Sequence, residues 1–417
     1  MYQSKVTVRS IKIVANENSI TDISSIFTSL NIRESIDIPT INGDITIQDE
    51  MGVYAFLPII GQELISIEFD DGDITSVVNG FVYKISHFKK ETPQRSRYVL
   101  YFSSYEQFVN QGKRIRRSFK SMTPSDIIVD ILRNDIKTTK KIVTERTSGD
   151  INYIAPNVTP FRAIKQLLKM SVSGNKDNSN YVFFENRISY IIAPVSSLLH
   201  QTPAFNYIYG DRVEDDTSSS PFMIEDFDSF KHTDTLDANT KGMFASQLHT
   251  VDLISRNIQT YDYDYFSEFD KMDHLNSIPL YKSLSDTSDS SQGNQYFNYV
   301  DNGMVEGNEK NEYVKSFDPN MLAVESSKTR LRNIIQNSMM DAYVYRIKIP
   351  GNISILPSTV INVEFPSSET EGVDPIISGN VLVTSVNHLI TGGGLYKQTI
   401  ETVKDSHIGD AGGWVFT

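Results

Sequence analysis

The residues that most often carry chemistry are scattered widely in this sequence. Its histidines are far apart, and the closest pair, His232 and His249, is separated by 17 positions, so no HExxH or other local zinc pair exists. The phosphate loop GxxxxGK, the nucleophile elbow GxSxG and the dinucleotide fingerprint GxGxxG are missing as well. We therefore predict no catalytic residue, no cofactor-binding residue and no metal ligand, and hence a protein that is not an enzyme. The histidines stand at positions 87, 200, 232, 249, 274, 388 and 407.

The run Asp70-Asp71-Gly72-Asp73 offers carboxylate oxygens that a cation would accept. A calcium loop of the EF-hand type needs ligands at alternate positions and a bidentate glutamate at the twelfth position, and this register fails here. The glycine suits a tight bend. We predict a turn between two strands.

Tyrosines and aspartates alternate from Tyr261 to Phe266. Such a surface suits a sugar, and paired carboxylates hydrolyse glycosidic bonds, so a glycan hydrolase that uses Asp262 and Asp264 stays open as an alternative. The same alternation is typical of a half-buried strand with an acidic outer face, and this is the interpretation we favour.

Composition excludes several classes of function. The chain has 417 residues and no cysteine, so disulfides, thiolate catalysis and thiolate metal sites are ruled out. A formal net charge of −13 disfavours tight binding to nucleic acid, whose phosphates would be repelled, although it suits a conduit through which DNA slides. The basic segment from Lys113 to Lys120 is predicted to be a linker or solvated strand, or to pair across an interface with the acidic stretch 211–228.

The segment from Phe27 to Phe69 has the apolar spacing of a sheet. Its isoleucines fall mostly at alternate positions between charged residues, which places them on one face of extended strands. Pro39 and Asn42-Gly43 are expected to mark turns, because proline lacks an amide donor and glycine accepts positive φ. An earlier strand is expected from Val6 to Val14. We predict a meander of antiparallel strands that forms a small barrel or sandwich.

The same order of features returns late in the chain. Ile65 to Phe69 matches Ile361 to Phe365, and each is followed by a strand that begins at glycine and carries a histidine, Gly80 to His87 and Gly379 to His388. Final strands follow from Tyr98 and from Tyr396. We align the early strands of the first copy with Phe244, Ser246, Ile258 and Asp262, and infer two copies of one β-module, with His87 and His388 as equivalent packing residues.

The second copy is expected to carry an insertion. Asp49 to Ile65 is 16 residues, whereas Asp262 to Ile361 is 99, a difference of 83. The insertion is predicted to include a flexible loop from Ser285 into the glycine-rich stretch that ends at Gly307, and a helix from Met321 to Asp341. The tail after residue 405 contains Trp414. We consider two interpretations of this tail equally, that it is disordered or that it docks on a partner.

Between the copies the apolar period changes to that of helices. Thr123-Pro124 and Thr159-Pro160 each place a capping hydroxyl before a proline at the first helical position. A hairpin from Tyr181 to Ile192 should pack against these helices. The fold class is therefore mainly β with α+β: two similar antiparallel β-barrel modules, an α+β domain and an insertion domain. The predicted domains are 1–112 (first module), 113–203 (α+β), 204–266 with 336–405 (second module), 267–335 (insertion) and 406–417 (tail).

This layout resembles the baseplate central hub protein of contractile-tailed phages of the T-even type, and more distantly the N-terminal half of VgrG spike proteins. The resemblance depends on order and spacing over about 330 positions. It is carried by Ser35 to Asp49, Gly61 to Phe69, Thr123 to Leu132, Thr159 to Leu168, Gly242 to Ser246 and Pro350 to Phe365.

The resemblance implies a homotrimer whose two barrels per chain alternate around an axis, so that a pseudo-sixfold ring adapts the hexameric tail tube to the trimeric central spike and encloses a DNA channel. Its partners would be the spike trimer, tail tube or tube-initiator proteins, and wedge or tape-measure proteins, with DNA passing only transiently. No fused lysozyme or needle is expected, so the spike is a separate chain. We expect a virion protein of the tail baseplate, assembled in the host cytoplasm, with no membrane anchor. A receptor-binding tail adhesin is the second alternative, because all-β trimers with polar loops also suit that task.

Overall fold

The computed structural model describes residues 4–409 apart from a set of internal segments. These segments are 17–18, 57–58, 175–179, 211–221, 232, 241, 253–256, 282–293, 300–336, 338–339, 341 and 368–371. The predicted helix 321–341 and the tail around Trp414 lie outside the described residues, apart from isolated positions near the helix end. No described helix is long and apolar enough to cross a membrane.

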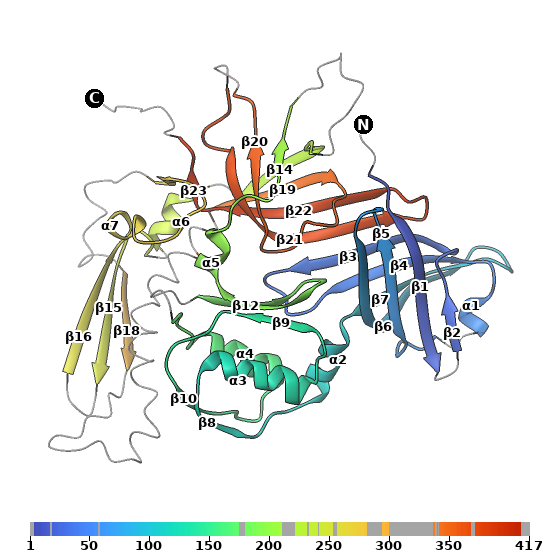
Figure 1. Cartoon of the computed structure of the whole chain (residues 1–417), viewed down its shortest axis with the longest axis horizontal. Coiled ribbons are helices and arrows are strands. Elements are labelled where there is room, and N and C mark those ends of the chain that lie inside the picture. Colours follow the sequence, from blue (N-terminus) through green and yellow to red (C-terminus); the bar gives the residue numbers. More distant parts are fainter. Residues whose placement is uncertain are drawn as a thin grey trace.

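A single sheet of 13 strands runs through both β-modules in the described part of the chain, and all but one of its strand pairs are antiparallel, which agrees with the predicted fold class (Figure 1). The first module lies at one side and the second above the centre. The strands of the first module are β1 (Thr7–Asn16), β2 (Ser19–Asp22), β3 (Phe27–Ser35), β4 (Asn42–Asp49), β5 (Leu64–Asp70), β6 (Thr75–Lys90) and β7 (Ser96–Ser103), with a short helix α1 (Val53–Phe56). Those of the second are β13 (Asn206–Ile208), β14 (Asp226–Lys231), β19 (Tyr343–Pro350), β20 (Val360–Glu364), β21 (Gly379–Thr391) and β22 (Tyr396–Lys404).

The two modules share one strand order. The path β3-β4-β7-β6-β5 in the first is repeated as β14-β19-β22-β21-β20 in the second. The late half of the predicted repeat is therefore correct at the level of strands, because β5, β6 and β7 correspond to β20, β21 and β22. The copies differ at their margin, where β1 pairs with β5 antiparallel but β13 pairs with β20 parallel.

The early half of the predicted repeat is wrong. Ser246 lies in β15 (Ala245–Asp252), which begins directly after Phe244, and both Ile258 and Asp262 lie in β16 (Asn257–Asp264). These two strands join β18 (Asn294–Tyr299) in a separate three-stranded sheet. Alternating residues specify a strand but not its partner, so β15 and β16 have the right pattern in the wrong sheet. The true equivalents of β3 and β4 are β14 and β19, which places the long insertion at 232–342. The other predicted domain boundaries stay predictions.

Two local expectations also change. Asn42-Gly43 opens strand β4 and is not a turn; a Cβ at Gly43 would stand 2.3 Å from the Phe102 ring, so glycine is needed there for close approach. The predicted loop from Ser285 to Gly307 contains β18, which pairs parallel to β15. The turn at Asp70 to Asp73 is confirmed, with Gly72 at φ +101.

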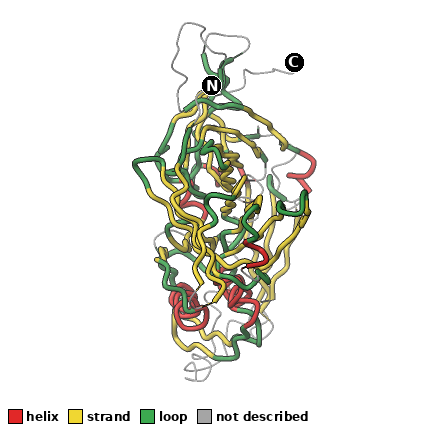
Figure 2. Tube along the Cα trace, turned by 90° about the vertical axis from the view of Figure 1, so that its right-hand side faces the viewer, coloured by secondary structure: helices red, strands yellow, loops and turns green. Residues whose placement is uncertain are grey.

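The α+β part covers one side of the β-modules, with α3 and α4 beneath a three-stranded sheet (Figure 1). In the turned view a group of helical turns lies toward the lower end of the molecule, and short helices lie above it (Figure 2). Both predicted helix starts and the hairpin are confirmed. The elements are α2 (Tyr105–Gly112), β8 (Ser118–Met122), α3 (Pro124–Asp130), the π-helical turn η1 (Ile131–Ile136), β9 (Lys141–Thr144), β10 (Ile151–Ile154), α4 (Pro160–Leu168), β11 (Tyr181–Glu185), β12 (Ser189–Pro194) and α5 (Val195–Leu199). The remaining elements are α6 (Thr235–Thr240), α7 (Tyr265–Phe269), β17 (Ile278–Pro279) and β23 (Ser406–His407).

The two Thr-Pro helix starts give a matched test of capping. Thr123 accepts a hydrogen bond from the Asp126 amide at 3.2 Å, whereas Thr159 makes no side-chain cap bond. We expect Thr123→Ala to lower the free energy of unfolding by about 1 kcal/mol and Thr159→Ala to lower it by less. Urea unfolding of both variants measures this, and equal losses would contradict the assigned cap.

Candidate functional site at the buried domain junctions

Three units of the chain meet at the side chain of Arg187. This residue lies in the β11–β12 turn of the α+β part, and its Nε stands 2.6 Å from the Glu34 carboxylate of β3. Its Nη2 donates to the carbonyls of Ile353 and Ile355, at 2.8 and 2.9 Å, in the β19–β20 connection of the second module. Arg187 and Glu34 side chains are 3% and 0% exposed. One guanidinium therefore ties both β-modules to the α+β part.

His388 completes this Arg187 junction from β21. Its Nε2 lies 3.0 Å from Glu34 Oε1, and its Nδ1 lies 2.8 Å from the Tyr396 hydroxyl. Because a carboxylate only accepts, Nε2 carries the proton and Nδ1 accepts from Tyr396. Burial, together with the Arg187 charge, lowers the pKa of His388 to about 4. Burial alone would raise the pKa of Glu34, but Arg187 and His388 outweigh it and hold that pKa below its ordinary value.

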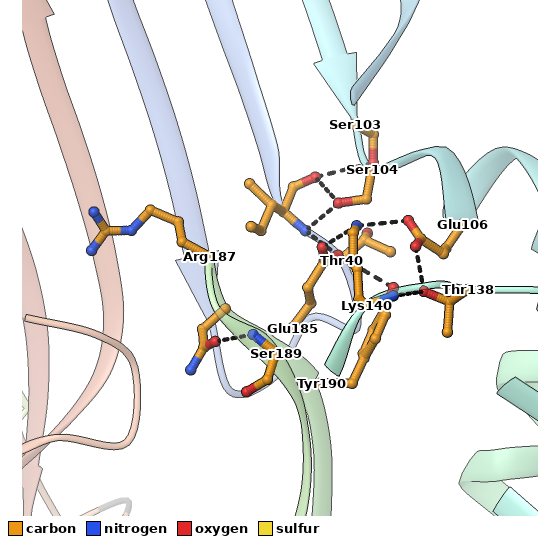
Figure 3. Close-up of polar contacts among 12 residues, drawn as sticks. Thr40, Ser103, Ser104, Glu106, Thr138, Lys140, Glu185, Arg187, Ser189 and Tyr190 are labelled. Carbon is orange, nitrogen blue, oxygen red and sulfur yellow. Dashed lines mark hydrogen bonds and ion pairs between the residues drawn. The ribbon is translucent and has the colours of Figure 1, made fainter. Parts of the chain in front are cut away.

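A second polar junction surrounds Lys140, between the first module and the α+β part (Figure 3). The Lys140 ammonium lies 2.7 Å from Glu106 Oε2 and also binds Glu185 Oε1. Glu185 Oε2 accepts from the Ile41 amide at 3.2 Å and from Tyr190 at 3.3 Å, and Glu106 Oε1 accepts from a threonine, Thr138, at 2.7 Å. Every oxygen of the two carboxylates thus has a donor from the protein itself.

The electrostatics of the Lys140 junction follow from its burial. Burial would lower the pKa of Lys140, but the carboxylates of Glu185 and Glu106 outweigh it and raise that pKa. Burial raises the pKa of Glu185 in spite of the lysine beside it. A lysine between two carboxylates can serve acid–base chemistry, yet here the lone pairs are already used to hold Ile41, Thr138 and Tyr190 in place. The arrangement is that of a structural joint.

The residues singled out in the sequence do not assemble into a reactive site. His87 is exposed at φ +53 while His388 is buried, so the expected shared packing role of these equivalent histidines is wrong. Asp262 accepts from Gln247, and Asp264 caps α7 by accepting from the Ser267 amide at 2.7 Å. Tyr263 is 4% exposed and Tyr265 is 0% exposed, so the predicted half-buried strand is confirmed.

Among the described residues no group of acidic residues and histidines is placed to hold a metal ion.

The other polar segments are also used within the chain. Asp71 Oδ1 accepts from the amides of Asp73 and Ile74, as a turn requires. In the basic segment, Arg117 binds the carboxylates of Asp130 and Asp135 and lies over the Phe119 ring. These partners belong to the α+β part and not to the stretch 211–228.

Neither polar junction was singled out from the sequence. Glu34 and Arg187 are 153 positions apart, and nothing local marks them. The available signal was weak: a glutamate inside the apolar alternation of 27–47, and an arginine in the predicted hairpin turn. Long-range pairing alone gives these residues their role.

Comparison with solved structures identifies the class of fold. The chain is similar to a tail protein from Neisseria meningitidis MC58, with a TM-score of 0.59, 11% identity and 97% of both chains covered. It is similar to a 43 kDa tail protein of prophage MuSo2 from Shewanella oneidensis, with a TM-score of 0.55, 14% identity and 95% and 99% coverage of the two chains. A third similar structure is Escherichia coli c3393, a type VI secretion component described as structurally similar to the T4 phage tail proteins gp27 and gp5. Its TM-score is 0.50, with 9% identity and 96% and 77% coverage.

The sequence itself matches no protein-family model and no curated protein. The chain has the fold of phage tail proteins, which agrees with the resemblance to a baseplate hub and to VgrG drawn from the sequence.

The Arg187 junction predicts a large loss of stability on removal of its cation. We expect Arg187→Met to lower the free energy of unfolding by about 3–5 kcal/mol, because Glu34 would stay buried without its partner charge. Arg33 is the control, because it pairs with Asp44 while its own side chain is 53% exposed. Arg33→Met should cost at most about 1 kcal/mol in the same urea unfolding experiment. Similar losses for both variants would contradict the role given to Arg187.

His388 predicts a defined pH dependence. Its folded-state pKa of about 4 lies below the ordinary value of 6.5, so between these values the unfolded chain binds a proton that the folded chain does not. The free energy of unfolding should therefore fall as the pH falls through this window, by up to about 1.4 kcal/mol per pH unit. His388→Gln should flatten this dependence when unfolding is followed from pH 7 to 4.5. An unchanged slope would show that other groups cause it.

Proposed function

We propose that this protein is the structural hub of a contractile phage tail baseplate. It acts as a homotrimer whose six β-modules form a pseudo-sixfold ring, which adapts the hexameric tail tube to the trimeric central spike and encloses a DNA channel. The single observation that carries the proposal is the repeated strand order within one continuous sheet. Similarity in fold to tail proteins supports the setting.

The symmetry argument is physical. A cyclic trimer offers three equivalent surfaces, whereas a sixfold tube requires six. Two modules with the same strand order in every chain supply six similar units from three chains. The buried Arg187 and Lys140 junctions hold the modules at one fixed angle to the α+β part, as a ring of constant geometry requires.

The same role defines the partners and the place of the protein. The central spike trimer binds one face, and the tail tube or a tube-initiator protein binds the opposite face. Wedge or tape-measure proteins are further neighbours, and DNA passes through the channel only transiently. A formal net charge of −13 suits such passage, because an acidic protein does not hold phosphates tightly. The protein belongs to the virion tail baseplate and is assembled in the host cytoplasm.

The hub role is non-enzymatic. The carboxylates of the Lys140 junction are saturated by donors of the protein, and Asp264, a candidate for glycan hydrolysis, is used as a helix cap. The adhesin alternative rests on the polar loop from Ser285, most of which lies outside the described residues. No observation on the described residues favours either alternative over the hub.

The proposal predicts the mass of the assembly. One chain is 47.2 kDa, so three chains make about 142 kDa. Light scattering after gel filtration should give this mass for the protein alone or together with its spike. A monomer under both conditions would contradict the proposal.

A further inference from the structure

We propose that neighbouring chains join by adding β14 of one chain to the second half of β6 of the next, while Met51 fills the position that Ile353 fills within a chain. This inference rests on the proposed trimer and names the surfaces that meet in it. It commits to a second copy of this chain as the occupant of both strand edges.

The template for the contact lies inside the chain, at the seam where the modules meet. Strand β21 pairs with β20 through its first residues, Gly379 to Leu382. Its later residues, Ser385 to Thr391, pair antiparallel with β3 of the first module, from Ser35 back to Ser29. One long strand thus serves its own module and then extends the sheet into the next module.

Each chain also carries the two halves of a second seam. Strand β6 is the equivalent of β21; its first residues, Thr75 to Phe81, pair with β5, and beyond them the edge away from β7 meets no described strand. Strand β14 is the equivalent of β3 and ends the sheet, so that among the described strands it pairs only with β19. Open strand edges of this kind are templates for pairing with another chain.

Residues that lie opposite one another on neighbouring strands form a row across each module, and comparing these rows gives the register between β14 and β6. In the first module the row runs Asn31, Asp44, Tyr101, Lys84, and in the second it runs Asp228, Arg346, Glu401, Ser385. Within the seam, Leu389 lies opposite Asn31. Leu389 lies four residues after Ser385 in β21, and the same four-residue step from Lys84 in β6 reaches Phe88. A bulge between Ser86 and Lys89 adds one residue to β6, so that Lys89 takes the equivalent paired position. Asp228 of one chain is therefore placed opposite Phe88 or Lys89 of the next.

Charge at the two edges is complementary in this register. The end of β6 carries Lys89 and Lys90, both exposed. The outer strand β14 carries Asp226 and Asp228, and the Asp226 side chain is 57% exposed in its pair with Lys348. With Asp228 opposite Phe88, antiparallel pairing places Asp226 opposite Lys90, and with the bulged register it places Asp228 opposite Lys89. Pairing of either edge with itself would oppose like charges. The edges therefore favour each other over self-pairing.

Met51 gives an independent indication of the same contact. It follows Asp44 by seven residues, and Ile353 follows Arg346, the equivalent of Asp44, by seven residues as well. Ile353 is 4% exposed and packs into the core of the adjoining first module. Met51 is 72% exposed. A large apolar side chain thus stands in solvent at the place where its equivalent is buried in a neighbouring module.

Engineered disulfides test the register, because the chain has no native cysteine. Asp228→Cys combined with Lys89→Cys, or with Phe88→Cys, should give dimers and trimers on a denaturing gel after oxidation, and these should disappear on reduction. Asp228→Cys with Lys84→Cys is out of register and should give none. Asn31→Cys with Leu389→Cys reports the known seam within one chain and should leave the mass unchanged.

The outcomes separate this inference from the proposed function. A trimer by light scattering with no cross-link from either test pair would overturn the strand contact and leave the hub proposal standing. A chain that stays monomeric with and without its spike would overturn both. Cross-links from the out-of-register pair as strong as those from the test pairs would also overturn the register.

Charge reversal tests the complementarity. Lys89→Glu with Lys90→Glu should raise the monomer–trimer midpoint concentration at least about tenfold, and adding Asp226→Lys with Asp228→Lys should restore it. Circular dichroism should be unchanged, since these residues lie at the surface. If the fourfold variant stays as weak as the double variant, the pairing is wrong.

The Met51 contact is tested in the same assay. Met51→Asp should shift the midpoint in the same direction, because a charge would enter the apolar core of the neighbouring chain. Ile60→Asp is the control, since Ile60 is 73% exposed and lies in the α1–β5 connection, nine residues from Met51. Equal effects of the two variants would overturn the role given to Met51.

Discussion

The structure depends on one buried charge pair that joins three parts of the chain. Glu34 and Arg187 lie out of contact with water, and the arginine also binds two carbonyls of the second module. A buried ion that loses its partner is costly, so this pair permits little sliding between the modules and the α+β part. The angle between the modules is set by hydrogen-bond geometry as well as by apolar packing.

Apolar packing fills the space around this pair but is less directional. One apolar cluster brings together residues of the α+β part and of both modules, among them Phe184, Leu199, Val360, Leu382 and Ile36. Burial of such side chains supplies much of the favourable free energy, and it is largely indifferent to small rotations. The polar junctions at Arg187 and Lys140 select one arrangement among those that would bury similar area.

The two modules share a strand order but not an environment. His388 is enclosed by Glu34 and Tyr396, whereas the equivalent His87 is exposed, and Ile353 is buried where Met51 is in solvent. The second module is covered by other parts of its own chain at positions where the first module is bare. A duplicated module thus acquires two sets of contacts, one used within the chain and one offered outside it.

The sequence by itself determined several strands and two helix starts, the buried faces of those elements and the late half of the repeat. Alternating isoleucines specify strands, and a threonine before a proline specifies a helix start, because both signals depend on neighbours in the chain. Which strands pair was decided only by the tertiary structure. Strand partners are chosen by contacts between distant segments, so β15 and β16 carried the expected pattern yet belong to another sheet. For the same reason no local signal revealed Glu34 and Arg187, which meet across 153 positions of chain.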